Sequence, residues 1–186
     1  MAYIDFHPTI HEIGDSAFIK AYIEGTLTGF SDRSLKTIGS RGLAGLSMVS
    51  LDLPNLEHSN SEALIDNSLP TLVLPMLDDA GTGLASKMPN LQMVCLPVCQ
   101  LLYGGAFQNC ASLTTVILGN HRGTTFNGAN IFAGTPVEAG SGYIYVRKSL
   151  VDTFKNATNA SVYAAQFRAI EDYPEIMEIL KEAEGS

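Results

Sequence analysis

The segment 104–120, GGAFQNCASLTTVILGN, is the clearest copy of a motif that recurs along this chain of 186 residues. Its second half reads apolar, two spacers, apolar, one spacer, leucine, and then a residue that turns the chain. With that last residue as an anchor, the copies end 21, 22 and 22 residues apart, at Pro54, Pro75, Pro97 and Gly119. A fixed period of this length is the signature of a repeat architecture.

Two columns of residues agree at this period. The positions six, three and one before the anchors are aliphatic or methionine in every copy: Met48, Leu51 and Leu53; Leu69, Leu72 and Leu74; Leu91, Val94 and Leu96; Leu113, Val116 and Leu118. Further upstream, a small residue precedes a large apolar one in Gly42-Leu43, Ala63-Leu64, Gly83-Leu84 and Ala106-Phe107, with Ile131-Phe132 as a fifth, degraded copy. Agreement in both columns predicts an internal repeat.

The spacing of the apolar positions predicts a coil that begins with a short strand. Alternate side chains of a strand point to the same face, so the last two apolar positions of each motif point inward together. Proline or glycine then ends the strand, and the small-large pair returns on the opposite side as a helical turn or irregular segment. One coil cannot bury its own leucines, so the coils must stack. We therefore expect an α/β solenoid with a parallel sheet along one face.

The copies resemble the BspA-like leucine-rich repeat, whose unit reads roughly I-G-x-x-A-F-x-x-C-x-x-L-x-x-V-x-L-P. The resemblance is carried by SRGLAGLSMVSLDLPN (residues 40–55) and above all by segment 104–120, where Ala106, Phe107, Cys110, Leu113, Val116 and Leu118 match. The second and third coils differ, with Asn67 and Met88 near the cysteine position. The segment 130–173 is similar to the closing part of such arrays. Over residues 35–146 the resemblance implies a leucine-rich repeat array with atypical caps.

We expect three parts: an N-terminal cap (1–34), four coils with an atypical closing coil (35–146), and a C-terminal helical cap (147–186). In the N-terminal cap, GDSAFIKAYIEG (14–25) has apolar residues at helical spacing and predicts a short helix, and a strand follows in 26–30.

At the C-terminal end the sequence predicts a strand (142–146), a short helix (148–157), a longer helix (160–173) and a final helix (174–185). Pro174 stands at a plausible first position of the final helix, which would dock on the array or on a partner chain.

Composition excludes several kinds of partner. The chain has a formal net charge of −8, a pI near 4.8 and only 11 Lys and Arg. Nucleic acid and anionic membranes are bound by clusters of basic residues, so we expect neither. The apolar runs are far shorter than the roughly 20 residues that span a bilayer, and the N-terminus has no secretory signal pattern. We expect a protein that is folded in the cytoplasm and not inserted into a membrane.

The sequence contains no convincing catalytic or metal-binding motif. Its three cysteines form no complete disulfide framework and read as small buried apolar residues. His7 and His11 flank Pro8 and have no evident third ligand, and the adjacent acids Asp78 and Asp79 read as solvated surface. We expect no enzyme activity, no cofactor and no metal.

The candidate binding surface is the outward face of the predicted sheet. Stacking places Val73, Cys95 and Ile117 in one apolar row, flanked by threonines and a methionine. An exposed apolar row bordered by polar residues often marks a contact. The alternative is that a cap or a second subunit covers this row. The candidate contact residues are Ser50, Asp52, Thr71, Val73, Met93, Cys95, Thr115 and Ile117.

These observations predict a non-catalytic binding or structural module. The resemblance implies a surface protein, because members are mostly adhesins of bacteria and some protists, and similar short arrays occur in phage virion proteins. A short, acidic array without an export signal favours a phage tail or host-recognition protein of the virion, with a protein or cell-surface glycan as partner. The alternatives are a bacterial cell-surface adhesin and an architectural virion subunit that contacts its own copies as a homo-oligomer.

Overall fold

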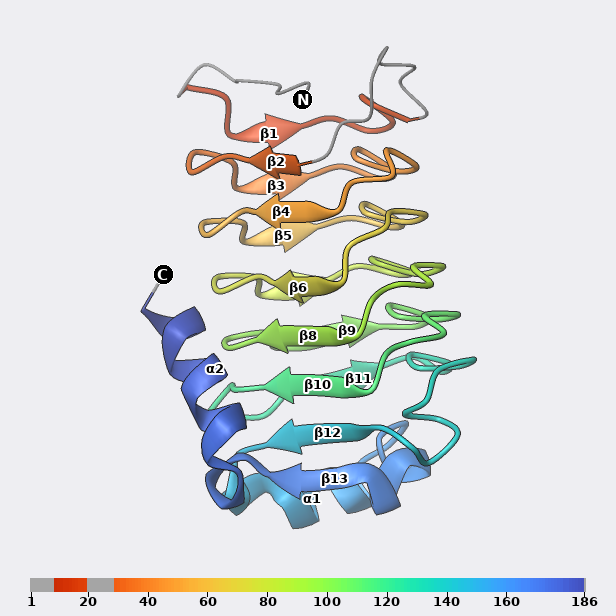
Figure 1. The fold of residues 1–186 in the computed structure, drawn as a ribbon, viewed down its shortest axis with the longest axis vertical. Coiled ribbons are helices and arrows are strands. Elements are labelled where there is room, and N and C mark those ends of the chain that lie inside the picture. Colours follow the sequence, from red (N-terminus) through yellow and green to blue (C-terminus); the bar gives the residue numbers. More distant parts are fainter. Residues whose placement is uncertain (1–8, 20–28, 186) are drawn as a thin grey trace.

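The computed structural model describes residues 9–19 and 29–185. They form a β-solenoid of about seven turns, built on parallel sheets (Figure 1). The predicted solenoid with a parallel sheet along one face is confirmed, but it is a β-solenoid with few helices and not the predicted α/β solenoid, because its return segments are turns. Successive strands of the chain alternate between two sides of the solenoid, so that odd-numbered strands up to β11 line one side and even-numbered strands line the other.

The first side carries the strands predicted from the leucine motif. They are β2 (Gly29–Ser31), β4 (Ser50–Asp52), β6 (Thr71–Val73), β8 (Met93–Leu96), β10 (Thr115–Leu118), β12 (Tyr143–Val146) and β13 (Phe167–Ala169). The last five form one hydrogen-bonded parallel sheet, while β2 and β4 pair with each other. Leu72 lies beside Val94 and Val94 beside Val116, as the repeat predicts. Of the twelve motif residues, all are buried except the half-buried Leu51.

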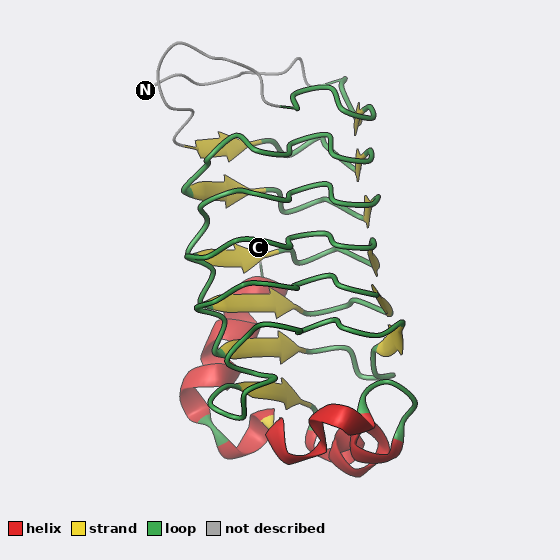
Figure 2. Ribbon diagram, turned by 90° about the vertical axis from the view of Figure 1, so that its right-hand side faces the viewer, coloured by secondary structure: helices red, strands yellow, loops and turns green. Residues whose placement is uncertain are grey.

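The second side carries a six-stranded parallel sheet that was not predicted (Figure 2). Its strands are β1 (Glu12–Ile13), β3 (Thr37–Ile38), β5 (His58–Ser59), β7 (Asp79–Ala80), β9 (Leu101–Tyr103) and β11 (Thr125–Asn127). Most are only two or three residues long. Such short strands leave no alternating pattern in the sequence, which is why only the stacked coils reveal them.

The return segments between the two sides stack through their backbones. In one of them the N–H groups of Arg41, Leu43 and Gly45 donate to carbonyls of the next coil, and the same alternation recurs at residues 62, 64 and 66 and at 83, 85 and 87. Each segment begins with a residue of positive φ: Ser16, Arg41, Glu62, Gly83, Gly105 and Asn130. The five segments whose last position is described also end with one: Gly45, Asp66, Lys87, Asn109 and Gly134. The left-handed residues therefore set the shape of every return segment.

This pattern shows that the small-large pair predicted in the third copy is misplaced by one residue. Gly83 has a φ of +65° and occupies the left-handed position that Glu62 occupies one coil earlier. The N–H of Ala85 then donates to the next coil as that of Leu64 does. The structural counterpart of Ala63-Leu64 is accordingly Leu84-Ala85, and not the predicted pair Gly83-Leu84.

Replacing Lys87 by glycine is expected to raise the free energy of unfolding by about 1 kcal/mol. Lys87 is exposed and has a φ of +57°, a conformation that costs an L-residue with a Cβ about 1–2 kcal/mol and costs glycine almost nothing. Urea denaturation measures the difference. Lys87→Ala, which removes the charge and keeps the Cβ, is the control and should leave stability nearly unchanged. Equal stabilisation by alanine would show that the charge, and not the backbone, is responsible.

At the N-terminal end the predicted helix is wrong for its described part. Residues 15–19 form turns, and the N–H groups of Ser16 and Phe18 donate to the carbonyls of Ser40 and Gly42 of the next coil. The stretch is therefore an additional return segment, whose hydrogen bonds to the next coil replace those of a helix. Residues 20–25 of the predicted helix and 26–28 of the predicted strand lie outside the described residues, while Gly29 and Phe30 belong to β2.

At the C-terminal end three of the four predicted elements are confirmed and one is wrong. The strand is β12, the short helix is the 3-10 turn η1 (Lys148–Leu150) with α1 (Val151–Asn156), and the final helix is α2 (Pro174–Glu184). The predicted helix over 160–173 is instead the 3-10 segment η2 (Ser161–Gln166), strand β13 and the 3-10 turn η3 (Ile170–Asp172).

The break in this helix has a physical cause. β13 pairs in parallel with β12, so its backbone satisfies the hydrogen bonds of what would otherwise be an open sheet edge. In this position Phe167 packs with Phe126 and Phe154, with ring centroids 6.3 and 5.2 Å away. Phe107, Phe132 and Tyr163 extend the same aromatic cluster, which closes the end of the apolar core.

Candidate functional site

The outward residues of the first-side sheet form two rows across the strands. In the first row Thr71, Met93, Thr115 and Tyr143 lie in register, and in the second row Val73, Cys95, Ile117 and Tyr145 do. Ser50 and Asp52 occupy the equivalent positions on β4. All eight predicted contact residues therefore lie on one face, as the repeat requires. Tyr143 and Tyr145 extend the rows and were not predicted, although the outward positions of the segment 142–146 contained the signal.

Helix α2 covers most of the second row. In Figure 1 it returns from the end of the array and runs past the carboxyl ends of β12, β10 and β8. Its residues Ile176, Leu180 and Ala183 bury Cys95 and Ile117 completely, and Tyr145 to 8% exposure. Of the two alternatives for the apolar row, the structure shows coverage by the chain's own final helix at Cys95 and Ile117. These two side chains do not reach solvent while α2 is docked.

Arg147 ties the end of α2 to the array. The Nε of Arg147 donates to the carbonyl of Gly119 at 2.8 Å, and its Nη2 donates to Oε1 of Glu184 at 2.6 Å. A Cβ at residue 119 would lie 2.5 Å from Cδ1 of Leu180. Glycine thus replaces the proline of the other anchors where the helix approaches closest.

The remaining predicted contact residues are accessible. Ser50, Asp52 and Thr71 are exposed, and Val73, Met93 and Thr115 are half-buried. At the other end of the first row Tyr143 is 37% exposed, and the guanidinium carbon of Arg168 lies 4.3 Å from its ring centroid. The open part of the face is therefore small and polar over β4 and β6, and aromatic and cationic near β12 and β13.

The cysteines lack the environment of nucleophiles. All three are free and buried. Burial raises the pKa of Cys95 and of Cys99 to about 12, with Glu184 adding to the shift at Cys95, and burial raises the pKa of Cys110 to about 11. Because the thiolate is the reactive form, these thiols are inert in the folded protein.

The histidines and paired acids lie on the surface. His58 Nδ1 is 3.5 Å from Asp79 Oδ2 across β5 and β7, and both side chains are at least one-third exposed. His11 Nδ1 is 2.8 Å from the carbonyl oxygen of Ser34, while His7 lies outside the described residues. Over residues 9–19 and 29–185 no three His, Cys, Asp or Glu side chains come together as a metal site would require.

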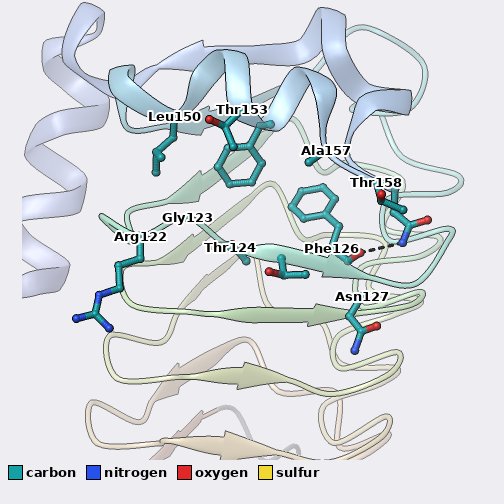
Figure 3. Close-up of a pocket in the computed structure, with 12 residues that line it drawn as sticks. Arg122, Gly123, Thr124, Phe126, Asn127, Leu150, Thr153, Ala157 and Thr158 are labelled. Atoms are coloured by element: carbon teal, nitrogen blue, oxygen red, sulfur yellow. Dashed lines mark hydrogen bonds between the residues drawn. The ribbon is translucent and has the colours of Figure 1, made fainter.

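A groove of about 470 Å³ lies between β11 and α1 (Figure 3). It was not predicted, because its walls come from two separate stretches of the sequence, residues 122–127 and 150–159. Phe126, Leu150, Phe154 and Ala157 supply its apolar lining, and threonines, asparagines and Arg122 supply its polar lining.

No protein-family model and no curated protein matches this sequence significantly. In the described part of the chain, no helix has the length and apolar character needed to cross a membrane.

Proposed function

We propose that the chain is a non-catalytic binding module that contacts a protein or a cell-surface glycan through the open part of its first-side sheet. One observation carries this proposal: Ser50, Asp52 and Thr71 stand exposed on adjacent parallel strands, beyond the part of the face that α2 covers. Thr71 stands on β6, which pairs in parallel with β8, so this part of the face is preorganised and little ordering cost opposes binding. Repeat arrays commonly use such extended surfaces for their partners.

We further propose that the solenoid is a BspA-like leucine-rich repeat array with a helical C-terminal cap. In the best-matching copy, every residue that carries the resemblance is buried in the core: Ala106, Phe107, Cys110, Leu113, Val116 and Leu118. Stacked coils bury the residues that define their repeat, so the burial of all six motif positions supports the family assignment. The cap proposal is supported by α1 and η2, which cover the aromatic end of the core.

The setting that we propose is a phage virion, where the chain would serve in the tail or in host recognition. The resemblance of the repeat to those that occur in phage virion proteins supports this setting. A bacterial surface adhesin is the alternative setting. An architectural virion subunit is the alternative role, and it is favoured by the exposed side chains of Val49 and Met76 at 49% and 46%, which suit contacts between copies.

Thr71→Arg tests the sheet face. A long cationic side chain at the centre of the open face is expected to weaken binding to cells at least about tenfold, through steric exclusion and charge mismatch. Fluorescently labelled protein is titrated against a panel of bacterial strains. Thr82→Arg, which places the same side chain at an exposed position just after β7 and away from the sheet face, is the control and should bind as the unchanged protein does.

Two results would count against host recognition through this face. Equal weakening by both arginine variants would assign the effect to charge alone. Absence of binding to any strain, together with a discrete oligomer in light scattering that only Thr71→Arg dissociates, would assign the face to self-contact in an architectural subunit.

A further inference from the structure

The groove between β11 and α1 combines an apolar floor with a polar rim. The rings of Phe126 and Phe154 meet edge to face with centroids 5.9 Å apart, and Leu150 and Ala157 continue the apolar lining. Figure 3 shows Arg122 at one end of the groove and Thr158 at the other, with the ring of Phe126 between them. Its volume of about 470 Å³ lies within the range of small-molecule sites.

The rim holds hydrogen-bonding groups that the fold does not use. Thr125 and Asn127 on β11, with Thr153 and Thr158 on the opposite wall, are exposed, and within the described residues their side chains make no hydrogen bond. By contrast, Thr124 Oγ1 donates to the carbonyl of Cys99 at 2.8 Å, and Asn159 Nδ2 donates to that of Phe126 at 2.9 Å. The first four side chains are thus available to a ligand, while the other two hold the walls.

The charge of the groove restricts the ligand further. The lining residues include one guanidinium, that of Arg122, and no carboxylate, although the chain as a whole carries a formal charge of −8. Over the described ranges, Arg122 makes no ion pair. A cationic ligand is therefore disfavoured, and a neutral or singly anionic ligand is favoured.

We propose that this groove binds a mono- or disaccharide, neutral or with one carboxylate. Sugars present C–H faces that pack on apolar and aromatic surface, and hydroxyl groups that both donate and accept hydrogen bonds. Threonine hydroxyls and asparagine amides do the same, so the rim matches the ligand without fixed charges. The groove is separate from the sheet face, and the proposal stands whether or not that face binds a partner.

The test uses ¹⁵N-labelled protein and titration with glucose, galactose, N-acetylglucosamine and glucuronic acid, followed by amide chemical shifts. At least one sugar should shift the amide signals of Gly123, Thr125 and Asn127 saturably, with a Kd of the order of 1 mM, while signals of β4 and β6 stay fixed. The double variant Asn127→Ala/Thr153→Ala removes one hydrogen-bonding group from each wall and should weaken binding about tenfold or more.

The control and the opposing outcomes are defined by the same spectra. Asn60→Ala/Thr82→Ala loses the same side chains at exposed positions outside the groove and outside the sheet face, and should bind with unchanged affinity. Arg122→Gln should weaken glucuronic acid and spare glucose. The proposal is overturned if no sugar shifts the groove signals up to about 50 times the expected Kd. It is also overturned if the shifts persist unchanged in Asn127→Ala/Thr153→Ala.

Discussion

Replacing Asn67 by leucine is expected to lower the free energy of unfolding by about 3–6 kcal/mol. The Asn67 side chain is 1% exposed, its Oδ1 accepts from the N–H of Met48 at 3.2 Å, and its Nδ2 donates to the carbonyls of Leu43 and Leu64 at 2.8 and 2.9 Å. Leucine has a similar shape and satisfies none of these groups. Each buried group left without a partner costs about 1–3 kcal/mol. Chemical denaturation followed by far-ultraviolet circular dichroism measures the difference in the free energy of unfolding.

Asn67→Cys is the matched variant for this position. In a later coil Cys110, at the equivalent place, donates its Sγ–H to the carbonyl of Ala85 at 3.1 Å. Cysteine at position 67 should therefore keep one of the three hydrogen bonds and lose less stability than leucine. If the leucine variant is as stable as the cysteine variant, water or a shifted backbone satisfies the three groups. The hydrogen bonds of Asn67 would then contribute nothing to the free energy of unfolding.

Replacing Leu180 by aspartate is expected to speed the alkylation of Cys95 at pH 8 by about 10²–10³-fold. Leu180 is 1% exposed against the sheet, and a carboxylate there must return to water, so α2 leaves the face. In the folded protein burial raises the pKa of Cys95 from 9.0 to about 12, and a tenfold change in thiolate accompanies each unit. A short pulse of iodoacetamide, followed by mass spectrometry of the peptides, measures each cysteine separately.

The pH dependence of the alkylation rate follows from the raised pKa of Cys95. In the unchanged protein Cys95 should stay slow from pH 8 to 10, because its thiol remains protonated. In Leu180→Asp the rate should rise with a midpoint near pH 9 and level off about one pH unit higher. Cys99 and Cys110 should stay protected in both proteins, since α2 does not contact them. Lys181→Asp places the same carboxylate at an exposed helix position and should leave Cys95 slow. Fast labelling of all three cysteines would indicate global unfolding and would contradict local release of α2.

The coils were predictable because the residues that recur with their period are those that must be buried. Leu72, Val94 and Val116 recur at a fixed interval, and any one of them predicts the position of the next. The second-side sheet was not predictable, because a two-residue strand such as His58–Ser59 has no periodicity of its own and exists only through its neighbours. The helix predicted over 160–173 failed for a related reason, since an open edge of β12 outweighed local helical preference at Phe167.

The outward rows of the sheet were predictable, but their coverage by α2 was predictable only in part. Alternation along each strand placed Cys95 and Ile117 on the outer face, and an apolar row implied that something rests on it. Nothing in a single repeat tells which segment does so. The glycine at position 119 was the one local signal, since it breaks the proline column where Leu180 makes its closest approach. The groove beside Phe126 carried no signal, because its two walls meet only in the folded closing coil.

The position of α2 after β8 and β10 in the sequence has a consequence for biosynthesis. The ribosome releases β8 and β10 before the residues that form α2, and domains begin to fold from the N-terminal side as they emerge. For that interval Cys95 and Ile117 form an uncovered apolar strip on a nascent solenoid. Neighbouring chains on a polysome offer two helices that can dock on this strip. Docking of the chain's own α2 gives the fold described above, and docking of a neighbour's α2 gives an exchanged dimer with identical contacts.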